Sequence, residues 1–315
     1  MGLKDKELRY YDSEILRLPA EKRTAYHKQV DRLVDTLRRH LRKRTKITIT
    51  RIVKAGSFAK FTILRRAADN PVDVDVVFYV SGADANNETL ESLSAAIYDI
   101  LIEMYPTKAV EDFEIQRKAA TVRFVGSRLS VDIVPVIEDE TRPGYGWQFD
   151  IRDSTKSETC APCQIKFVRD RKEKDSDFRT LVRLGKQWRN RAELKPLKSF
   201  TVELILAHLL DTQGNQCCIE ERFRNFLLYV AQSGLQQQIS FPENGKPLGI
   251  FSHPVVIIDP VNSFNNVTSR ISEEERQTIV AAAQNSWEIA TFASVENDQE
   301  AWKEIFGPRF KTEED

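Results

Sequence analysis

The chain has 315 residues, of which 41% are apolar and 30% are charged, and this composition excludes a chain that is disordered throughout. Its 47 Lys and Arg residues balance its 47 Asp and Glu residues, so the formal net charge is zero. Proteins that bind long nucleic acids usually carry an excess of basic charge, because phosphate contacts dominate that affinity. The zero net charge therefore favours small substrates such as nucleoside triphosphates, but it does not exclude a local basic patch.

No apolar run reaches the ~20 residues that a membrane-spanning helix needs. The first twelve residues also lack the hydrophobic segment of a signal peptide. We therefore expect a soluble protein of the cytoplasm that does not enter a membrane.

The first long element in the chain is predicted to be a helix that ends near Arg44, where Arg and Lys residues are dense. These cations either complement the negative end of the helix dipole or form a patch for phosphate or nucleic acid. Charge runs are usually solvated faces, which favours the first interpretation. The helix is indicated by apolar residues at three- and four-residue spacing, namely Tyr26, Val30, Leu33, Val34, Leu37 and Leu41.

The rest of the first half alternates between strand and helix patterns. Runs rich in β-branched residues predict strands, and an amphipathic stretch between them predicts a helix. The strands are expected at residues 47–54, 72–80, 119–125 and 129–137, and the helix at residues 89–105.

From about residue 164 the pattern changes to helices, interrupted by one strand-like run at 254–258. The last helix is predicted to open at Ser272, because Glu275 three residues later completes a capping box. We therefore expect a mixed α/β (α+β) fold in two parts. Residues 1–160 would form a long N-terminal helix and an α/β core, and residues 161–315 a mainly helical lobe that closes the active-site cleft.

Four cysteines form two short patterns, Cys160-x-x-Cys163 and the adjacent pair Cys217-Cys218. Neither spacing matches a standard zinc finger, even with His208 as a further ligand. Cytosolic proteins keep most thiols reduced. We therefore expect four reduced thiols, and zinc binding by them stays open.

Two carboxylates, Asp73 and Asp75, lie in the most β-like run of the chain, separated by Val74. Side chains two residues apart project from the same face of a strand, roughly 7 Å from each other. Two carboxylates so placed repel each other unless a cation lies between them. Hard oxygen ligands of this kind suit Mg²⁺, which commonly binds through one or two carboxylates and substrate phosphates.

A third carboxylate, Asp132, lies in another predicted strand. If that strand is beside the first, the three carboxylates can hold two metal ions about 4 Å apart, one activating the attacking hydroxyl and one stabilising the leaving oxygen. Taken alone, a pair such as Asp73 and Asp75 is more often a solvated strand end, so the prediction depends on its context.

That context is the Gly56-Ser57 turn, which ends the preceding predicted strand and opens a short helix. Glycine lets the backbone approach a phosphate closely, and amides with a hydroxyl at a helix start bind anions. A phosphate turn followed by two carboxylates and then a third predicts a triphosphate site.

This order resembles the signature of the DNA polymerase β-like nucleotidyltransferase superfamily, although the 15 residues between Ser57 and Asp73 make a longer loop than that signature usually has. Residues 181–188 and 198–203 are similar to the helical lobe of oligoadenylate synthetases and cyclic GMP-AMP synthase. Residues 254–267 are similar to the late Asp-Pro…Asn-Asn-Val segment of oligoadenylate synthetases. The best match is with the cGAS/DncV-like nucleotidyltransferases (CD-NTases) of bacterial anti-phage systems.

The resemblance implies a nucleotidyltransferase core with a mixed sheet, followed by the helical lobe. It also implies that Asp73 and Asp75 bind two Mg²⁺ ions, with Mn²⁺ as the alternative, and that Asp132 binds the ion that activates the acceptor hydroxyl.

The resemblance further assigns the nucleotide-binding residues. Gly56 and Ser57 would hold the donor triphosphate from one side, Lys186 and Ser199 would hold it from the other, and Phe200 would stack on the donor base. Cations and hydroxyls suit phosphates, and an aromatic face suits a base. The alternatives are that Lys186 is a surface lysine and that Phe200 packs in the core.

The function implied by the resemblance is Mg²⁺-dependent condensation of nucleoside triphosphates into a cyclic di- or trinucleotide second messenger, with release of pyrophosphate. In anti-phage defence such a product activates a separate effector, and the sequence leaves open whether a regulatory partner acts on the enzyme. We expect a monomer.

One alternative function is a template-independent enzyme that makes linear oligonucleotides or extends RNA ends, which should show a continuous basic track. Another is an inactive binding module or a scaffold with the same fold. An inactive module should lack a carboxylate, whereas all three candidates are present.

Overall fold

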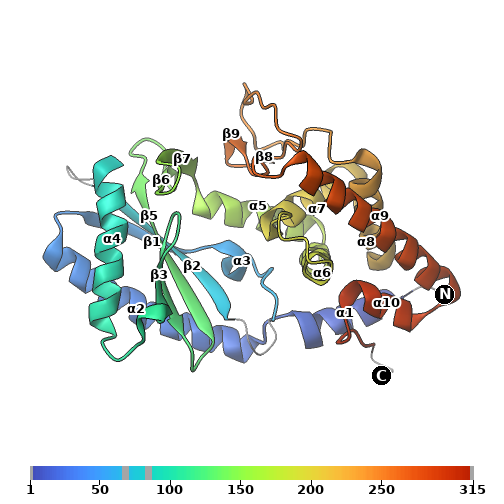
Figure 1. Cartoon of the computed structure of the whole chain (residues 1–315), viewed down its shortest axis with the longest axis horizontal. Helices are drawn as coiled ribbons and strands as arrows, with labels where there is room; N and C mark the ends of the chain where they lie inside the picture. The colour runs from blue at the N-terminus through green and yellow to red at the C-terminus, as the bar shows by residue number, and fades with distance from the viewer. Residues whose placement is uncertain (1–2, 66–70, 82–86, 313–315) are drawn as a thin grey trace. The chain divides into compact units, whose positions relative to one another are not determined.

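The computed structural model describes residues 3–65, 71–81 and 87–312, which divide into two compact units (Figure 1). The sheet unit is Leu18–Lys166, and the helical unit combines Met1–Arg17 with Phe167–Asp315. The sequence grouped residues 1–17 with the α/β core, whereas here they belong to the helical unit. Helix α5 (Ala161–Lys174) crosses the boundary between the units.

The sheet unit contains one mixed sheet, as the sequence predicts. Its main order is β1-β2-β5-β4-β3, and β6 pairs with both β5 and β7. Strands β2 and β5 are parallel, and the other pairs are antiparallel. The strands are β1 (Thr48–Lys54), β2 (Val72–Ser81), β3 (Phe113–Ile115), β4 (Ala120–Phe124), β5 (Leu129–Glu138), β6 (Gly146–Asp150) and β7 (Thr155–Thr159).

Helices α2 (Ala20–Arg44) and α4 (Asn87–Met104) pack on one face of this sheet (Figure 1). The apolar stripe of α2 that the sequence predicts is buried there, together with alternate residues of β2 from Val72 to Val80. Because side chains alternate along a strand, the residues between them in β2 face away from these two helices. Two further short helices are α3 (Gly56–Ala59) and the 3₁₀ turn Val110–Asp112.

The helical unit follows the predicted helices closely, and the capping box of Ser272 and Glu275 opens α9 as predicted. In place of a strand confined to residues 254–258, the structure has a short hairpin of β8 and β9. The elements of this unit are α1 (Asp5–Tyr11), a π-helical turn (Asp12–Leu16), the second part of α5, α6 (Phe178–Arg191), α7 (Ser199–Gln213), α8 (Ile219–Ser233), β8 (Ile258–Asp259), β9 (Asn262–Asn266), α9 (Glu273–Glu296) and α10 (Gln299–Phe306).

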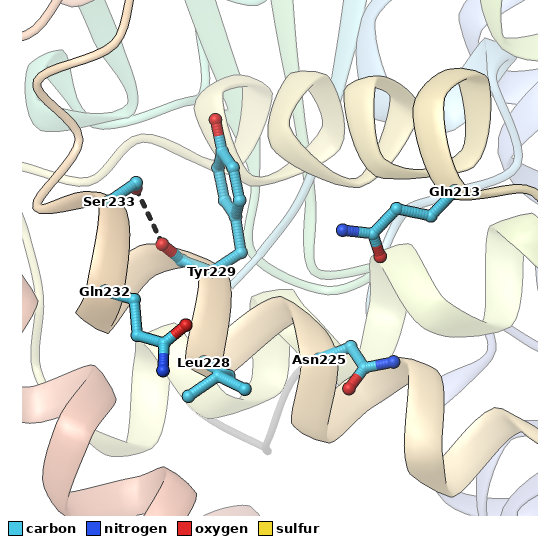
Figure 2. Close-up of a pocket in the computed structure, with 6 residues that line it drawn as sticks. All are labelled: Gln213, Asn225, Leu228, Tyr229, Gln232 and Ser233. Carbon is cyan, nitrogen blue, oxygen red and sulfur yellow. Dashed lines mark hydrogen bonds between the residues drawn. The ribbon is translucent and has the colours of Figure 1, made fainter.

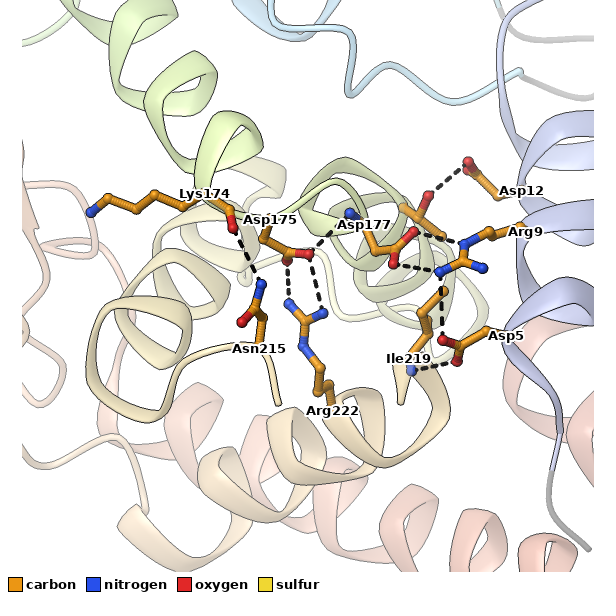
Figure 3. Close-up of polar contacts among 10 residues, drawn as sticks. Asp5, Arg9, Asp12, Lys174, Asp175, Asp177, Asn215, Ile219 and Arg222 are labelled. Atoms are coloured by element: carbon orange, nitrogen blue, oxygen red, sulfur yellow. Dashed lines mark hydrogen bonds and ion pairs between the residues drawn. The ribbon is translucent and has the colours of Figure 1, made fainter. Parts of the chain in front are cut away.

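The N-terminal segment is bound into the helical unit by charged groups (Figure 3). Arg9 donates to both carboxylate oxygens of Asp177, at 2.9 and 2.8 Å, and Asp5 accepts the backbone N–H of Ile219 at 2.7 Å. Asp12 is fully buried and pairs with the buried guanidinium of Arg183, with an Nη2–Oδ2 distance of 2.7 Å. These contacts explain why residues 1–17 join the helical unit.

The structure corrects the expectation of four reduced thiols. Cys160 and Cys163 form a disulfide, whereas Cys217 and Cys218 are free and exposed. A disulfide removes the first two sulfurs as thiolate ligands for zinc. Pairing of two cysteines three residues apart depends on the local backbone, which the spacing alone does not determine.

Within residues 3–65, 71–81 and 87–312, no helix combines the length and the apolar character needed to cross a membrane.

The buried ion pair of Asp12 yields a stability prediction. Asp12→Ala removes the buried carboxylate that pairs with Arg183, so the free energy of unfolding should fall by about 3–5 kcal/mol. Urea unfolding followed by tryptophan fluorescence measures this loss.

The matched control is Glu300→Ala, which removes an exposed ion pair with Lys303 and should change the free energy of unfolding by at most about 1 kcal/mol. Equal losses in the two variants would contradict a stabilising role for the Asp12 pair.

Candidate functional site

The pairing of β2 with β5 determines where the predicted carboxylates lie. In the parallel register Asp75 is opposite Asp132, and Asp73 is opposite Ser130. Residues opposite each other on neighbouring strands are about 4.8 Å apart and project from the same face. Asp73, Asp75 and Asp132 therefore share the face that α2 and α4 leave uncovered.

Burial and like charge perturb these carboxyl groups. Burial raises the pKa of Asp75, the nearby charge of Asp73 raises it further, and Lys60 opposes the shift. Burial also raises the pKa of Asp132 to about 6, with smaller contributions from Asp75 and Asp73. Thr121 opposes that shift, because its hydroxyl donates a 2.7 Å hydrogen bond to Asp132 Oδ1. Burial and neighbouring negative charge thus both disfavour the ionised forms of Asp75 and Asp132.

The Gly56-Ser57 turn lies directly against the second carboxylate. Gly56 has a φ of +60°, and a Cβ on this residue would collide with the carboxylate of Asp75. The preceding residue, Ala55, donates its N–H to the carbonyl oxygen of Asp75 at 2.8 Å. Position 56 therefore requires glycine for two reasons: the positive φ of its backbone and the closeness of the Asp75 carboxylate.

The carboxylate oxygens of Asp73, Asp75 and Asp132 are hard ligands of the kind that divalent cations such as Mg²⁺ prefer. Among the residues that the structure describes, no three His, Cys, Asp or Glu side chains are arranged to hold a metal ion by themselves. Mg²⁺ commonly takes only one or two protein carboxylates and completes its shell with substrate phosphates and water. Asp75 and Asp132, adjacent and crowded with negative charge, fit that requirement.

Asp75 and Asp132 line a cavity of about 560 Å³ in the sheet unit, and Asp73 is not among its lining residues. The basic residues that line this cavity were not identified from the sequence. The signal that could have found them is the adjacent pair Arg117-Lys118 beside a predicted strand. Arg117 also donates to Asp150 at 3.1 Å, so part of its charge is compensated. The lining residues are Asp75, Glu114, Gln116, Arg117, Lys118, Ala119, Asp132, Val134, Gln148 and Arg152.

The other predicted nucleotide-binding residues belong to the helical unit and are described with that unit alone. Lys186 lies on α6 and is only 4% exposed, which excludes the alternative of a surface lysine. Ser199 and Phe200 form the start of α7, where Ser199 is exposed and Phe200 is half-buried. Phe200 is therefore not a fully buried core residue.

A second cavity, of about 430 Å³, lies between the end of α7 and the second half of α8 (Figure 2). Its lining is dominated by amides and hydroxyls and contains no carboxylate, thiol or amine, and none of the predicted site residues. Ser233 donates to the carbonyl oxygen of Tyr229 at 2.6 Å beside it. The residues around it are Gln213, Asn225, Leu228, Tyr229, Gln232 and Ser233.

Residues 18–200 match the family of the Second Messenger Oligonucleotide or Dinucleotide Synthetase (SMODS) domain. The match begins where the sheet unit begins, and it includes all the predicted site residues.

Full-length relatives are similar over nearly the whole chain. The CBASS oligonucleotide cyclase CdnC of Escherichia coli (strain KTE188) is 62% identical over 314 residues, which cover 100% of this chain and 99% of the relative. The cyclic AMP-AMP-AMP synthase of Escherichia coli (strain MS 115-1) is 31% identical, with 97% of both chains covered.

The fold is similar to that of E. coli MS115-1 CdnC, which has been solved with ATP and in complex with HORMA-deltaN. The TM-scores are 0.83 and 0.81, at 30% identity, with 98% of this chain and 99% of that chain covered. These matches confirm the nucleotidyltransferase fold and the resemblance to the CD-NTases.

The electrostatics of the carboxylates can be tested by titration. Asp75→Asn removes a neighbouring negative charge, so the pKa of Asp132 should fall below its value of about 6. It should stay above the usual Asp value because burial, the main cause of the shift, is unchanged. Carboxyl ¹³C chemical shifts recorded against pH measure both values.

The control is Glu140→Gln, which removes an exposed charge from the same unit and should leave the Asp132 titration unchanged. An unchanged pKa in the Asp75→Asn variant would show that the two carboxylates do not interact.

Proposed function

This chain belongs to the family of second messenger oligonucleotide or dinucleotide synthetases, and we propose that it condenses nucleoside triphosphates into a cyclic oligonucleotide for anti-phage defence. The observation that carries the proposal is the register that sets Asp75 opposite Asp132, beside the glycine turn at Gly56. A carboxylate pair next to a turn that accepts phosphate is the arrangement that nucleotidyl transfer needs.

In the proposed reaction an acceptor hydroxyl attacks the α-phosphorus of a donor triphosphate. A bond forms between the hydroxyl oxygen and the α-phosphorus, the bond from that phosphorus to the pyrophosphate oxygen breaks, and the hydroxyl proton passes to solvent. Asp73, Asp75 and Asp132 would hold two divalent cations, Mg²⁺ or Mn²⁺. Such cations would activate the attacking hydroxyl and stabilise the leaving oxygen.

The other predicted residues would position the donor. Gly56 and Ser57 would bind its triphosphate through backbone amides and a hydroxyl, and Lys186 and Ser199 would add a cation and a second hydroxyl. Phe200 would stack on the donor base, for which a half-buried aromatic ring is suited.

The acceptor would occupy the cavity beside the carboxylates. Arg117, Lys118 and Arg152 supply positive charge there, and Gln116 and Gln148 supply amide donors and acceptors. This composition suits a phosphorylated nucleotide, whose phosphates pair with the cations and whose base pairs with the amides.

For the product, we propose a cyclic trinucleotide of adenosine, because a 31% identical relative is a cyclic AMP-AMP-AMP synthase. The solved complex of E. coli MS115-1 CdnC with HORMA-deltaN supports a regulatory partner of the same kind for this chain. The product would act on a separate effector. A linear product or RNA-end extension is the alternative.

The reaction can be tested with labelled ATP, GTP, CTP and UTP and either Mg²⁺ or Mn²⁺, with and without a HORMA partner. Phosphatase treatment and chromatography should reveal a resistant product that ATP alone suffices to make. Asp73→Asn/Asp75→Asn should reduce its rate at least about 100-fold, because metal ions contribute several kcal/mol to such transition states.

Glu140→Gln is the control variant and should retain full activity, since Glu140 is exposed and outside the cavity. Products that phosphatase degrades would favour linear synthesis. A cyclic product that the double variant still makes at the normal rate would contradict the proposed site.

The glycine turn has its own test. Gly56→Ala places a methyl group against the carboxylate of Asp75 at a positive φ, so the carboxylate must move. A displacement of about 1 Å at a reacting centre can reduce the rate about 100-fold, and we expect a loss of that size. The product assay measures it.

Gly126→Ala is the matched control, because a Cβ there meets no atom within 4 Å and Gly126 does not have a positive φ. Normal activity in Gly56→Ala would show that the position of Asp75 does not depend on this turn.

A further inference from the structure

Helix α5 begins immediately after Cys160, and a disulfide joins this residue to Cys163 within the first helical turn. The intervening residues are Ala161 and Pro162. In the chain-entropy account, a disulfide stabilises a protein more as the loop it closes grows longer, and this loop is among the shortest. Stabilisation of the fold is therefore a weak explanation for the bond.

The two sulfurs differ in access. Cys160 is fully buried, whereas Cys163 is half-buried. Thiol–disulfide exchange proceeds by attack of a thiolate on one sulfur, and only a sulfur within reach of solvent can be attacked. Cys163 is the more exposed of the two residues, so we assign its sulfur as the one attacked and Cys160 as the leaving group.

The surroundings of Cys160 suit a leaving thiolate. Its sulfur accepts the backbone N–H of Cys163 at 3.2 Å, and it lies at the N-terminus of a 14-residue helix. Both features stabilise negative charge on the sulfur, and a more stable leaving thiolate departs faster.

The first turn of α5 is attached to the strand that carries Asp73 and Asp75. The hydroxyl of Tyr79, on β2, accepts the N–H of Ala161 at 3.1 Å and donates to the carbonyl oxygen of Gly144 at 2.7 Å. Ala161 also packs with Tyr79 in a small apolar cluster. Tyr79 is an even number of residues from Asp75, so both project from the same face of β2.

We propose that Cys160–Cys163 is a redox modification site, reduced by a small or protein dithiol, and that its reduction loosens the first turn of α5 from the carboxylate face of the sheet. A thiolate of the dithiol bonds to Cys163 Sγ, and the Cys160–Cys163 bond breaks with its electron pair on Cys160 Sγ, which then takes up a proton. The second thiol of the dithiol attacks the mixed disulfide and releases Cys163. Two electrons pass from the dithiol to the cysteine pair, and the dithiol becomes a cyclic disulfide.

The first experiment counts thiols in the full chain carrying Cys217→Ser/Cys218→Ser, which removes the two exposed cysteines. The oxidised protein is incubated with dithiothreitol in native buffer, quenched with acid and alkylated in denaturant before mass spectrometry. We expect two alkyl groups, at Cys160 and Cys163, without prior unfolding. A bond that resists dithiothreitol until denaturant is added, or thiols that a mild oxidant does not rejoin, would overturn the proposal.

The second experiment tests which sulfur is attacked. In the same background, Cys160→Ser leaves the half-buried Cys163 and Cys163→Ser leaves the buried Cys160. We expect Cys163 to form a mixed disulfide with oxidised glutathione at least about tenfold faster than Cys160, in line with its access. Equal rates, or a faster Cys160, would overturn the assigned order of attack.

The third experiment follows the helix by hydrogen exchange. Reduction should speed exchange at the amides of Cys163 and Gln164 by about tenfold, because their contacts open more often. Cys160→Ser/Cys163→Ser is the matched control and should exchange at the faster rate with or without reductant. Equal exchange rates in the oxidised and reduced forms would overturn the proposal that reduction loosens the first turn of α5. None of these measurements requires nucleotide synthesis, so their failure is distinct from failure of the proposed function.

Discussion

The parallel pairing of β2 with β5 is the constraint on which the candidate site depends. It sets Asp75 opposite Asp132 and directs both carboxylates to one face of the sheet. A shift of the register by one residue would direct one of them into the apolar layer beneath α2 and α4. The valines of β2 that alternate with the aspartates prevent this shift, because they are buried in that layer. Core packing on one face of the sheet therefore positions the carboxylates on the other face.

This arrangement places carboxylates close together in a buried part of the sheet face. Burial and mutual repulsion raise the pKa of Asp75 and of Asp132, so the crowded ionised state is disfavoured without a cation. The buried layer between the sheet, α2 and α4 must offset this destabilisation. Crowded carboxylates with raised pKa values are typical of sites that bind metal or transfer protons, and in this chain they coincide with the glycine turn at Gly56.

Much of the sheet unit could be predicted from sequence because its signals are local. Alternation in residues 72–80 revealed the strand, and it also indicated that Asp73 and Asp75 share a face. The parallel pairing with β5 was not predicted. The sequence supported only the conditional statement that the strand of Asp132 could lie beside residues 72–80, because no local pattern specifies a distant partner strand. The basic residues of the cavity, the ion pair of Asp12 with Arg183 and the Cys160–Cys163 bond all depend on tertiary contacts, and they were missed or predicted wrongly.

Strand β2 carries Asp73, Asp75 and Tyr79 on one face. This face connects the candidate site with the first turn of α5, which lies far away in the sequence. Tyr79 forms hydrogen bonds with Ala161 and Gly144, so the first turn of α5 is fixed to the same rigid strand as Asp75. Since α5 continues from the sheet unit into the helical unit, one of the two covalent connections between the units starts at this anchor, and the other is at Arg17–Leu18. A change at Cys160 and Cys163 acts on the one helix that belongs to both units. The disulfide therefore lies at the start of a helix whose residues belong to both units.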